Sequence, residues 1–150
     1  MIEVLCPEPA DTQALGGRLA SILRPGDVVV LAGGLGSGKT LFTGGIAAGL
    51  GVEETVLSPS FVLVRQYQSG FMPLVHVDVY RLGSLNEFED LDVFELSRDG
   101  VLVIEWGDAV DSLMPSDHLR VEFHVGPTDD RTLRLTTAGD WSSRDLGEII

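Results

Sequence analysis

A glycine-rich segment constrains this chain more than any other feature. Residues 33–40 read GGLGSGKT, which matches the pattern GxxxxGK[ST] at every fixed position. An apolar, β-branched run precedes the segment at 27–31, and a run suited to a helix follows it at 41–50. This order of strand, glycine loop and helix is typical of a phosphate-binding loop, in which backbone N–H groups surround phosphate oxygens at a helix N-terminus.

The residue types of the loop predict how it binds a nucleotide. Lys39, the only lysine in the chain, supplies a positive charge for the outer phosphates, and the Thr40 hydroxyl is a typical Mg²⁺ ligand. The predicted nucleotide-binding residues are the loop and the residue after it: Gly33, Gly34, Leu35, Gly36, Ser37, Gly38, Lys39, Thr40 and Leu41.

Periodicity elsewhere predicts a single domain over residues 1–150. The expected helices cover 11–23, with Asp11 as N-cap, 41–50, with Gly51 as C-cap, and 84–96, with a break. The expected strands cover 27–31, 61–67, 73–80, 101–106, 119–125 and 131–136, and a tight turn at 69–70 makes the second and third antiparallel. The sum is a three-layer α/β fold of the P-loop NTPase type, with a mixed parallel/antiparallel central sheet and a C-terminal β-hairpin.

Charge and composition restrict the partners of the chain. The net charge is −13, so the protein repels polyanions, and we expect no direct binding to tRNA, DNA or anionic membranes. The N-terminus has no signal-peptide pattern and no run of 18 apolar residues occurs, which favours a cytoplasmic protein.

Cys6 is the single cysteine, which excludes an internal disulfide and favours a packed thiol. The three histidines are scattered along the chain, so their spacing predicts no metal site.

Two carboxylates stand where phosphoryl transfer or hydrolysis needs one, at the end of a buried strand beside the loop. Glu105 ends the apolar run 101–104, as in a Walker B strand, and Asp78 ends the run 74–77. We predict both as catalytic residues, and Thr40 with Glu105 as the Mg²⁺ ligands. The residues alone leave open which carboxylate lies closer to the metal, and whether either only caps a strand or pairs with an arginine. Trp106, directly after Glu105, is predicted either as a further catalytic residue or as a core aromatic residue, with equal weight.

Four motifs, in order along the chain, resemble the TsaE (YjeE) family. They are the glycine loop, SPSF at 58–61, HVDVYR at 76–81 and Ile104-Glu105-Trp106. The resemblance covers roughly residues 10–115 and implies that Lys39 binds phosphate and Thr40 ligates magnesium. It also implies that Asp78, Glu105 and Trp106 are functional residues and that 58–61 is a switch-type loop.

The chain departs from the family pattern at three places. Gly34 replaces a common aspartate, Leu41 replaces a common threonine, and Gly107-Asp108 stands where Pro-Glu is frequent. Leu41 removes a hydroxyl that could touch the nucleotide.

The family resemblance implies a small Mg²⁺-dependent ATPase, with ATP and ADP as its nucleotides, that is required for the threonylcarbamoyl modification of adenosine 37 in tRNA. Such proteins do not perform the transfer. They act as accessories of a TsaB–TsaD heterodimer, which stimulates them, so that tRNA is met only through the complex. An acidic surface agrees with this indirect role.

Two alternatives to this ATPase stay open, a P-loop small-molecule kinase and a nucleotide-gated binding module. A P-loop small-molecule kinase closes an arginine-bearing lid over its acceptor, whereas residues 83–100 carry Arg98 among six acidic side chains. A GTPase is disfavoured because the only asparagine, Asn86, does not begin an Asn-Lys-x-Asp segment. A nucleotide-gated binding module with negligible turnover is the non-enzymatic alternative.

Overall fold

The computed structural model describes residues 1–57, 64–79, 85–105 and 112–150. The strands are β1 (Ile2–Cys6), β2 (Val28–Ala32), β3 (Val64–Tyr67), β4 (Leu74–Asp78), β5 (Val101–Glu105), β6 (His118–Val125) and β7 (Arg131–Ala138). The helices are α1 (Pro9–Ala20), α2 (Lys39–Gly49), α3 (Leu85–Asp90) and α4 (Val93–Leu96), and two 3₁₀ helices follow β7 at Gly139–Ser143 and Leu146–Glu148. None of the helices in these ranges is long and apolar enough to cross a membrane.

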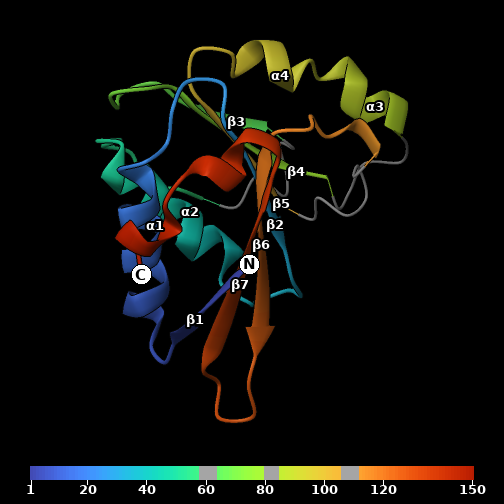
Figure 1. Ribbon diagram of the computed structural model, residues 1–150. Coiled ribbons are helices and arrows are strands. Elements are labelled where there is room, and N and C mark those ends of the chain that lie inside the picture. Colours follow the sequence, from blue (N-terminus) through green and yellow to red (C-terminus); the bar gives the residue numbers. More distant parts are fainter. Residues whose placement is uncertain (58–63, 80–84, 106–111) are drawn as a thin grey trace.

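The strands form one mixed sheet in the order β1-β7-β6-β2-β5-β4-β3 (Figure 1). The central strands β6, β2, β5 and β4 are parallel to one another. Antiparallel pairs flank them, with β7 and β1 beyond β6 and with β3 beyond β4. The predicted three-layer α/β fold, with its mixed sheet and its hairpin of β6 and β7, is therefore confirmed.

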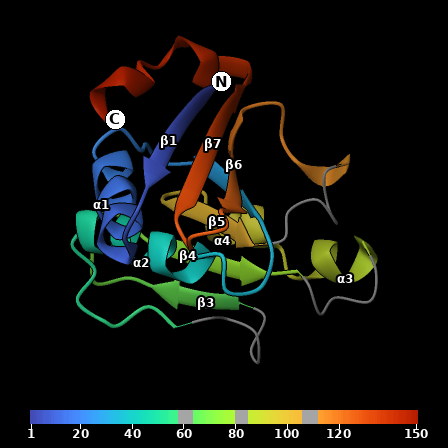
Figure 2. The ribbon, with the colours of Figure 1, turned by 90° about the horizontal axis from the view of Figure 1, so that it is seen from below.

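Alternation along the buried strands separates the core into two layers. In β2, Val29 and Leu31 belong to the cluster that includes side chains of α1 and α2, while Val28 and Val30 belong to the cluster that includes Phe88 of α3. Successive side chains of a strand point to opposite faces, so α1 and α2 cover one face and the segment of α3 and α4 packs on the other (Figure 2). All five residues of β2 are buried, as a central parallel strand requires.

The helices α1 and α2 touch through glycines. A Cβ atom added at Gly16 would lie 2.3 Å from the Phe42 carbonyl oxygen, and one at Gly45 would lie 2.0 Å from the Gln13 carbonyl oxygen. At Gly49 the added atom would lie 2.5 Å from Ala20 Cβ. No side chain fits between the two backbones at these points, so glycine fixes how closely α2 approaches α1.

The C-terminal tail is tied to the start of β2 by a buried ion pair. Arg144 donates from Nη1 to Asp27 Oδ2 at 2.6 Å and from Nη2 to Oδ1 at 2.7 Å. Its guanidinium carbon also lies 3.9 Å from the centroid of the buried Trp141 ring. Both charged side chains are at most 10% exposed, and each has one further partner, since Asp27 Oδ2 accepts the Arg24 backbone N–H and Arg144 Nη1 donates to the Ile22 carbonyl oxygen.

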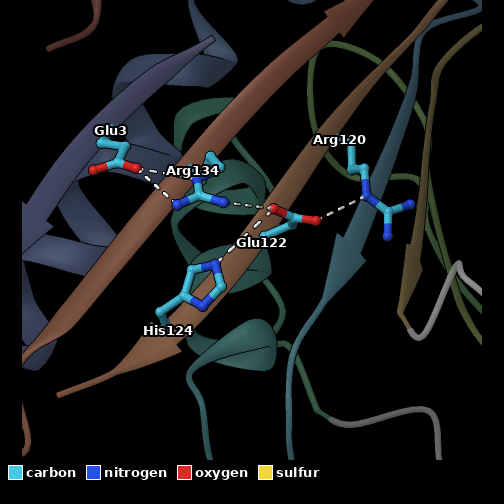
Figure 3. A network of polar contacts seen from close by, with 5 residues as sticks. All are labelled: Glu3, Arg120, Glu122, His124 and Arg134. Atoms are coloured by element: carbon cyan, nitrogen blue, oxygen red, sulfur yellow. Dashed lines mark hydrogen bonds and ion pairs between the residues drawn. The ribbon is translucent and has the colours of Figure 1, made fainter.

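A ladder of charged side chains crosses the face of β1, β7 and β6 that points away from α1 and α2 (Figure 3). Arg134 lies between Glu3, at 2.9 Å, and Glu122, at 3.8 Å. Glu122 also meets Arg120 at 3.4 Å and His124 at 3.9 Å. Opposite charges on neighbouring strands favour this register, although each half-exposed pair contributes only about 0–1 kcal/mol.

Several boundaries differ from the sequence prediction. Helix α1 begins at Pro9 rather than after Asp11, because proline suits the first helical turn and the Asp11 carboxylate accepts the Glu8 backbone N–H at 2.9 Å. Helix α2 begins at Lys39, two residues earlier than expected, and its C-cap is Leu50, with Gly51 following at φ +82°.

One connection and one strand also differ from the sequence prediction. The register pairs Tyr67 with Leu74, so the antiparallel β3 and β4 are joined by residues 68–73 and not by a tight turn. Strand β1 was not predicted at all. It pairs with β7, and its buried Cys6 confirms the packed thiol, whose pKa is raised by burial.

Candidate functional site

The glycine loop connects the end of β2 to the start of α2. Gly36 and Gly38 have φ angles of +73° and +107°, where side chains are strained. A Cβ atom at Gly33 would lie 2.8 Å from Ser37 Oγ and 2.9 Å from Phe123 Cβ. Gly34 differs, since an added Cβ would meet no atom within 4 Å, so packing does not require glycine there.

Lys39 crosses the loop from the first position of α2. Its Nζ donates to the carbonyl oxygens of Gly33 at 2.7 Å and Gly34 at 3.0 Å, and the residue is 6% exposed. Burial lowers the pKa of the ammonium group, while the nearby Glu105 and Asp78 carboxylates act in the opposite direction. The lysine is therefore held over the loop carbonyls, with two acidic groups near it.

A buried polar atom inside the loop has no hydrogen-bond partner among the residues that the structure describes. This atom is Ser37 Oγ, in a residue that is 1% exposed. Buried hydroxyl groups are nearly always hydrogen bonded, so an unsatisfied one in a loop of this shape fits a ligand that carries oxygen atoms. The loop, Lys39 and Ser37 together suit a phosphate group.

Thr40 and the two predicted carboxylates meet beside the loop. Thr40 Oγ1 donates to Glu105 Oε1 at 3.1 Å. Asp78 and Glu105 are register partners at the ends of the parallel strands β4 and β5, and each residue is 3% exposed. Glu105 therefore does more than cap a strand, because it contacts the hydroxyl group predicted to bind Mg²⁺.

The chemistry of these groups fits a hard cation. A threonine hydroxyl and carboxylate oxygens are ligands that Mg²⁺ accepts, and Mg²⁺ in nucleotide sites takes only one or two carboxylates beside water and phosphate oxygens. The described ranges hold no cluster of three or more His, Cys, Asp or Glu residues that could bind a metal. The protein would therefore supply only part of the ligands of a bound Mg²⁺, with water and phosphate oxygens supplying the rest.

A cavity of about 150 Å³ opens beside the loop. Its lining includes Cys6 and Thr12 on one side and Gly38, Leu41 and Arg131 on the other. Thr12 Oγ1 is buried, and the Thr12 side chain acts as a hydrogen-bonding group toward the Cys6 thiol. A cavity of this size holds one ring-sized group, and Pro7, Pro9 and Leu41 in its lining offer apolar contacts.

Arg131 braces the loop from the first residue of β7. Its Nε donates to the Ser37 carbonyl oxygen and its Nη2 to the Gly36 carbonyl oxygen, each at 3.1 Å. Sequence reasoning missed this residue because 94 and 95 positions separate the partners, and nothing local distinguishes it from the other arginines of the hairpin. His76, which lies 3.5 Å from Glu105, was also missed as a site residue.

The structure brings together Lys39, Thr40, Asp78 and Glu105, which the sequence places up to 66 positions apart. Trp106, the predicted switch-type segment 58–61 and the departure at 107–108 lie outside the described residues. Leu35, which was also predicted to bind the nucleotide, is 83% exposed in the loop.

Comparison with known proteins agrees with this geometry. Residues 6–133 match the family model described as threonylcarbamoyl adenosine biosynthesis protein TsaE. The chain belongs to the TsaE family. A Streptomyces coelicolor tRNA threonylcarbamoyladenosine biosynthesis protein TsaE is 45% identical over 143 residues, which are 90% of this chain and 97% of that one. A Bacillus subtilis TsaE is 38% identical over 133 residues, 88% of this chain and 83% of that one.

A solved structure supports the same assignment. The crystal structure of Bacillus subtilis YdiB matches with a TM-score of 0.79 and 31% identity, covering 95% of this chain and 89% of that chain. The resemblance read from the four motifs is therefore confirmed at the level of the family and of the P-loop fold, and membership of TsaE places the chain in tRNA threonylcarbamoyladenosine biosynthesis.

Proposed function

We propose that this protein is an Mg²⁺-dependent ATPase that acts as an accessory of a TsaB–TsaD heterodimer in the threonylcarbamoyl modification of tRNA. The observation that carries the proposal is the 3.1 Å contact between Thr40 Oγ1 and Glu105, beside a glycine loop that Lys39 already spans. A phosphate loop joined in this way to a strand-end carboxylate is the arrangement typical of P-loop proteins that hydrolyse nucleotides.

Each residue has a distinct part in this proposal. The loop N–H groups and Lys39 bind the phosphates, and the lysine exchanges its bonds to the Gly33 and Gly34 carbonyls for phosphate oxygens. Thr40 and Glu105 hold Mg²⁺, with Glu105 either bound directly or through water. Mg²⁺, when bound, neutralises charge on the phosphate oxygens. Asp78 adds a second carboxylate next to Glu105, where it helps to orient the attacking water.

The cavity beside the loop is the proposed site of the base. It borders Gly36, Gly38 and Leu41, so a nucleotide with its phosphates in the loop extends directly into it. Leu41, Pro7 and Pro9 offer apolar contacts to a base, and Arg131, which also lines the cavity, keeps the loop backbone in place. Adenine is preferred because the chain has no guanine-reading Asn-Lys-x-Asp segment.

The acidic character of the chain supports an indirect role toward tRNA. A protein of net charge −13 gains nothing from counterion release on a polyanion, so contact with tRNA is proposed to occur only through TsaB–TsaD. We propose the cytoplasm as its location, since tRNA modification is the process to which its family belongs.

The test compares ATP binding and hydrolysis by the chain alone and with purified TsaB–TsaD. We expect Lys39→Ala to lose nucleotide binding, and Glu105→Gln to bind ATP but to lose turnover by on the order of 100-fold, the scale for one transition-state contact. Glu95→Gln is the matched control, because this glutamate is 60% exposed and pairs only with Arg98 among the described residues.

The outcomes separate the candidate functions. Full turnover by Lys39→Ala would remove the phosphate-loop assignment. Tight ATP binding without hydrolysis in any condition would instead favour a nucleotide-gated binding module. Equal affinity for TsaB–TsaD with ATP, with ADP and without nucleotide would contradict the proposed nucleotide-driven role.

A further inference from the structure

His76 is a polar residue at the centre of the apolar strand β4. It is 0% exposed, and neither ring nitrogen has a hydrogen-bond partner in the described structure. Burying a polar group without a hydrogen bond costs free energy, and an apolar side chain of similar volume would avoid that cost. The presence of an imidazole at this position therefore calls for a reason other than packing.

The position of His76 directs its ring toward the proposed catalytic centre. Alternation along β4 puts it on the same face as Asp78, whereas Val75 and Val77 belong to the core on the opposite face. His76 Nε2 lies 3.5 Å from Glu105 Oε2. The other oxygen of the same carboxylate, Oε1, accepts the Thr40 hydroxyl at 3.1 Å. Glu105 is thus approached by a donor at each of its two oxygens.

The contact at 3.5 Å is longer than a formed N–H···O bond, which spans about 2.7–3.2 Å. Polar contacts of catalytic groups are commonly long before substrate binds and shorten in the complex. His76 is fully buried in a packed strand, so closing this distance requires movement of the Glu105 carboxylate. Both the neutral ring protonated at Nε2 and the imidazolium carry this donor, so His76 can hold Glu105 in either charge state.

We propose that His76 is the positioning residue for Glu105, and that its Nε2–H holds Oε2 so that Oε1 stays aimed at Thr40 and the metal. The inference rests on the proposed ATPase function for its catalytic consequence. Hydrogen-bonded partners of metal-binding carboxylates typically affect metal affinity or activity by about 10- to 100-fold. Nothing in the comparisons assigns a role to this histidine.

The first experiment observes His76 without nucleotide. In the ¹⁵N-histidine-labelled protein, NMR should show His76 protonated at Nε2, with a shift that moves in Glu105→Gln. His118, whose Nδ1 lies 2.9 Å from the Pro115 carbonyl oxygen, should not move and serves as the control. A bare Nε2 on His76, or a signal indifferent to Glu105→Gln, would overturn the proposal.

The second experiment compares His76→Met with His76→Gln in the presence of TsaB–TsaD. Methionine fills the space without a donor, whereas the glutamine amide can place an N–H near the position of Nε2. We expect His76→Met to fold at least as stably as wild type, to lower kcat by about 10- to 100-fold, and to change affinity for Mg²⁺-free ADP less than about twofold. His76→Gln should recover most of kcat, and His118→Gln should behave as wild type.

The two experiments separate a positioning role of His76 from a purely structural one. Wild-type turnover in His76→Met, or an equal loss in both variants, would show that the histidine is structural. A wild-type protein without ATP turnover would overturn the proposed function, yet the NMR measurement would still decide whether His76 donates to Glu105. The two ideas therefore fail separately.

Discussion

The close contact between α1 and α2 predicts opposite effects for one substitution at two adjacent glycines. Gly44 and Gly45 both lie inside α2, where alanine is favoured over glycine by about 0.5–1 kcal/mol. An added Cβ at Gly44 meets no atom within 4 Å. At Gly45 it would lie 2.0 Å from the Gln13 carbonyl oxygen, whereas ordinary contact begins at 3.4 Å.

The difference between 3.4 Å and 2.0 Å means that the helices must separate by about 1.4 Å at Gly45. Overpacking in a well-filled core typically costs about 1–3 kcal/mol, and here the obstacle is backbone that cannot rotate away. We therefore expect Gly44→Ala to be more stable than wild type by about 0.5–1 kcal/mol. Gly45→Ala should be less stable by about 2 kcal/mol after the same gain in helix propensity is included.

Urea unfolding followed by circular dichroism measures both changes. With an m-value of about 2 kcal/mol/M, the midpoint should fall by about 1 M in Gly45→Ala and rise slightly in Gly44→Ala. The displacement also carries Lys39 and Thr40 at the start of α2, so Gly45→Ala should weaken nucleotide binding as well. Equal stability of the two variants would refute the idea that α1 and α2 are packed backbone to backbone.

Three further predictions concern charge and the loop. Arg144→Met should lower the free energy of unfolding by about 3–5 kcal/mol, because it leaves the charge of the buried Asp27 carboxylate unpaired, with the Arg24 backbone N–H as its remaining partner, and combining it with Asp27→Asn should recover part of that loss in the same urea assay. Burial lowers the pKa of Lys39 below its ordinary value of 10.5, so the unfolded chain binds more protons as the pH approaches 10.5 from below. The free energy of unfolding of wild type relative to Lys39→Met should therefore rise with pH in that range, and a flat difference would contradict the burial of the Lys39 ammonium group. Arg131→Met should remove the brace on the Ser37 and Gly36 carbonyls and weaken nucleotide affinity about tenfold by calorimetry, whereas Arg98→Met, at an exposed surface pair, should not.

The sequence predicted those parts of the fold that depend on local pattern. The runs that became β2 and β5 are apolar and bounded by glycine or charge, and the hairpin strands alternate, so each was visible without tertiary information. Strand β1 was not, although Ile2, Val4 and Cys6 alternate toward the core, because a short edge strand is stabilised by pairing with β7 at the far end of the chain.

The residues of the candidate site also fall into those that the sequence predicts and those that only the folded structure reveals. Lys39 and Thr40 follow from a motif, and Asp78 and Glu105 from their place at strand ends. Arg131 and the role of His76 depend on distances between segments that only the folded sheet brings together. A histidine inside a strand gives no local sign of whether it packs or donates a hydrogen bond, so the sequence pattern assigned His76 no role in the site.

The order of strands in the sheet has a consequence for how the protein is made. Strand β2 leads into the glycine loop, but both of its neighbours come much later, since Val29 pairs with Val103 of β5 and with Leu119 of β6. On the ribosome, β2 and α2 are therefore synthesised long before either flanking strand exists. We expect the nascent chain to expose this wholly apolar strand until β6 has emerged, and to acquire a nucleotide-competent loop only near the end of translation.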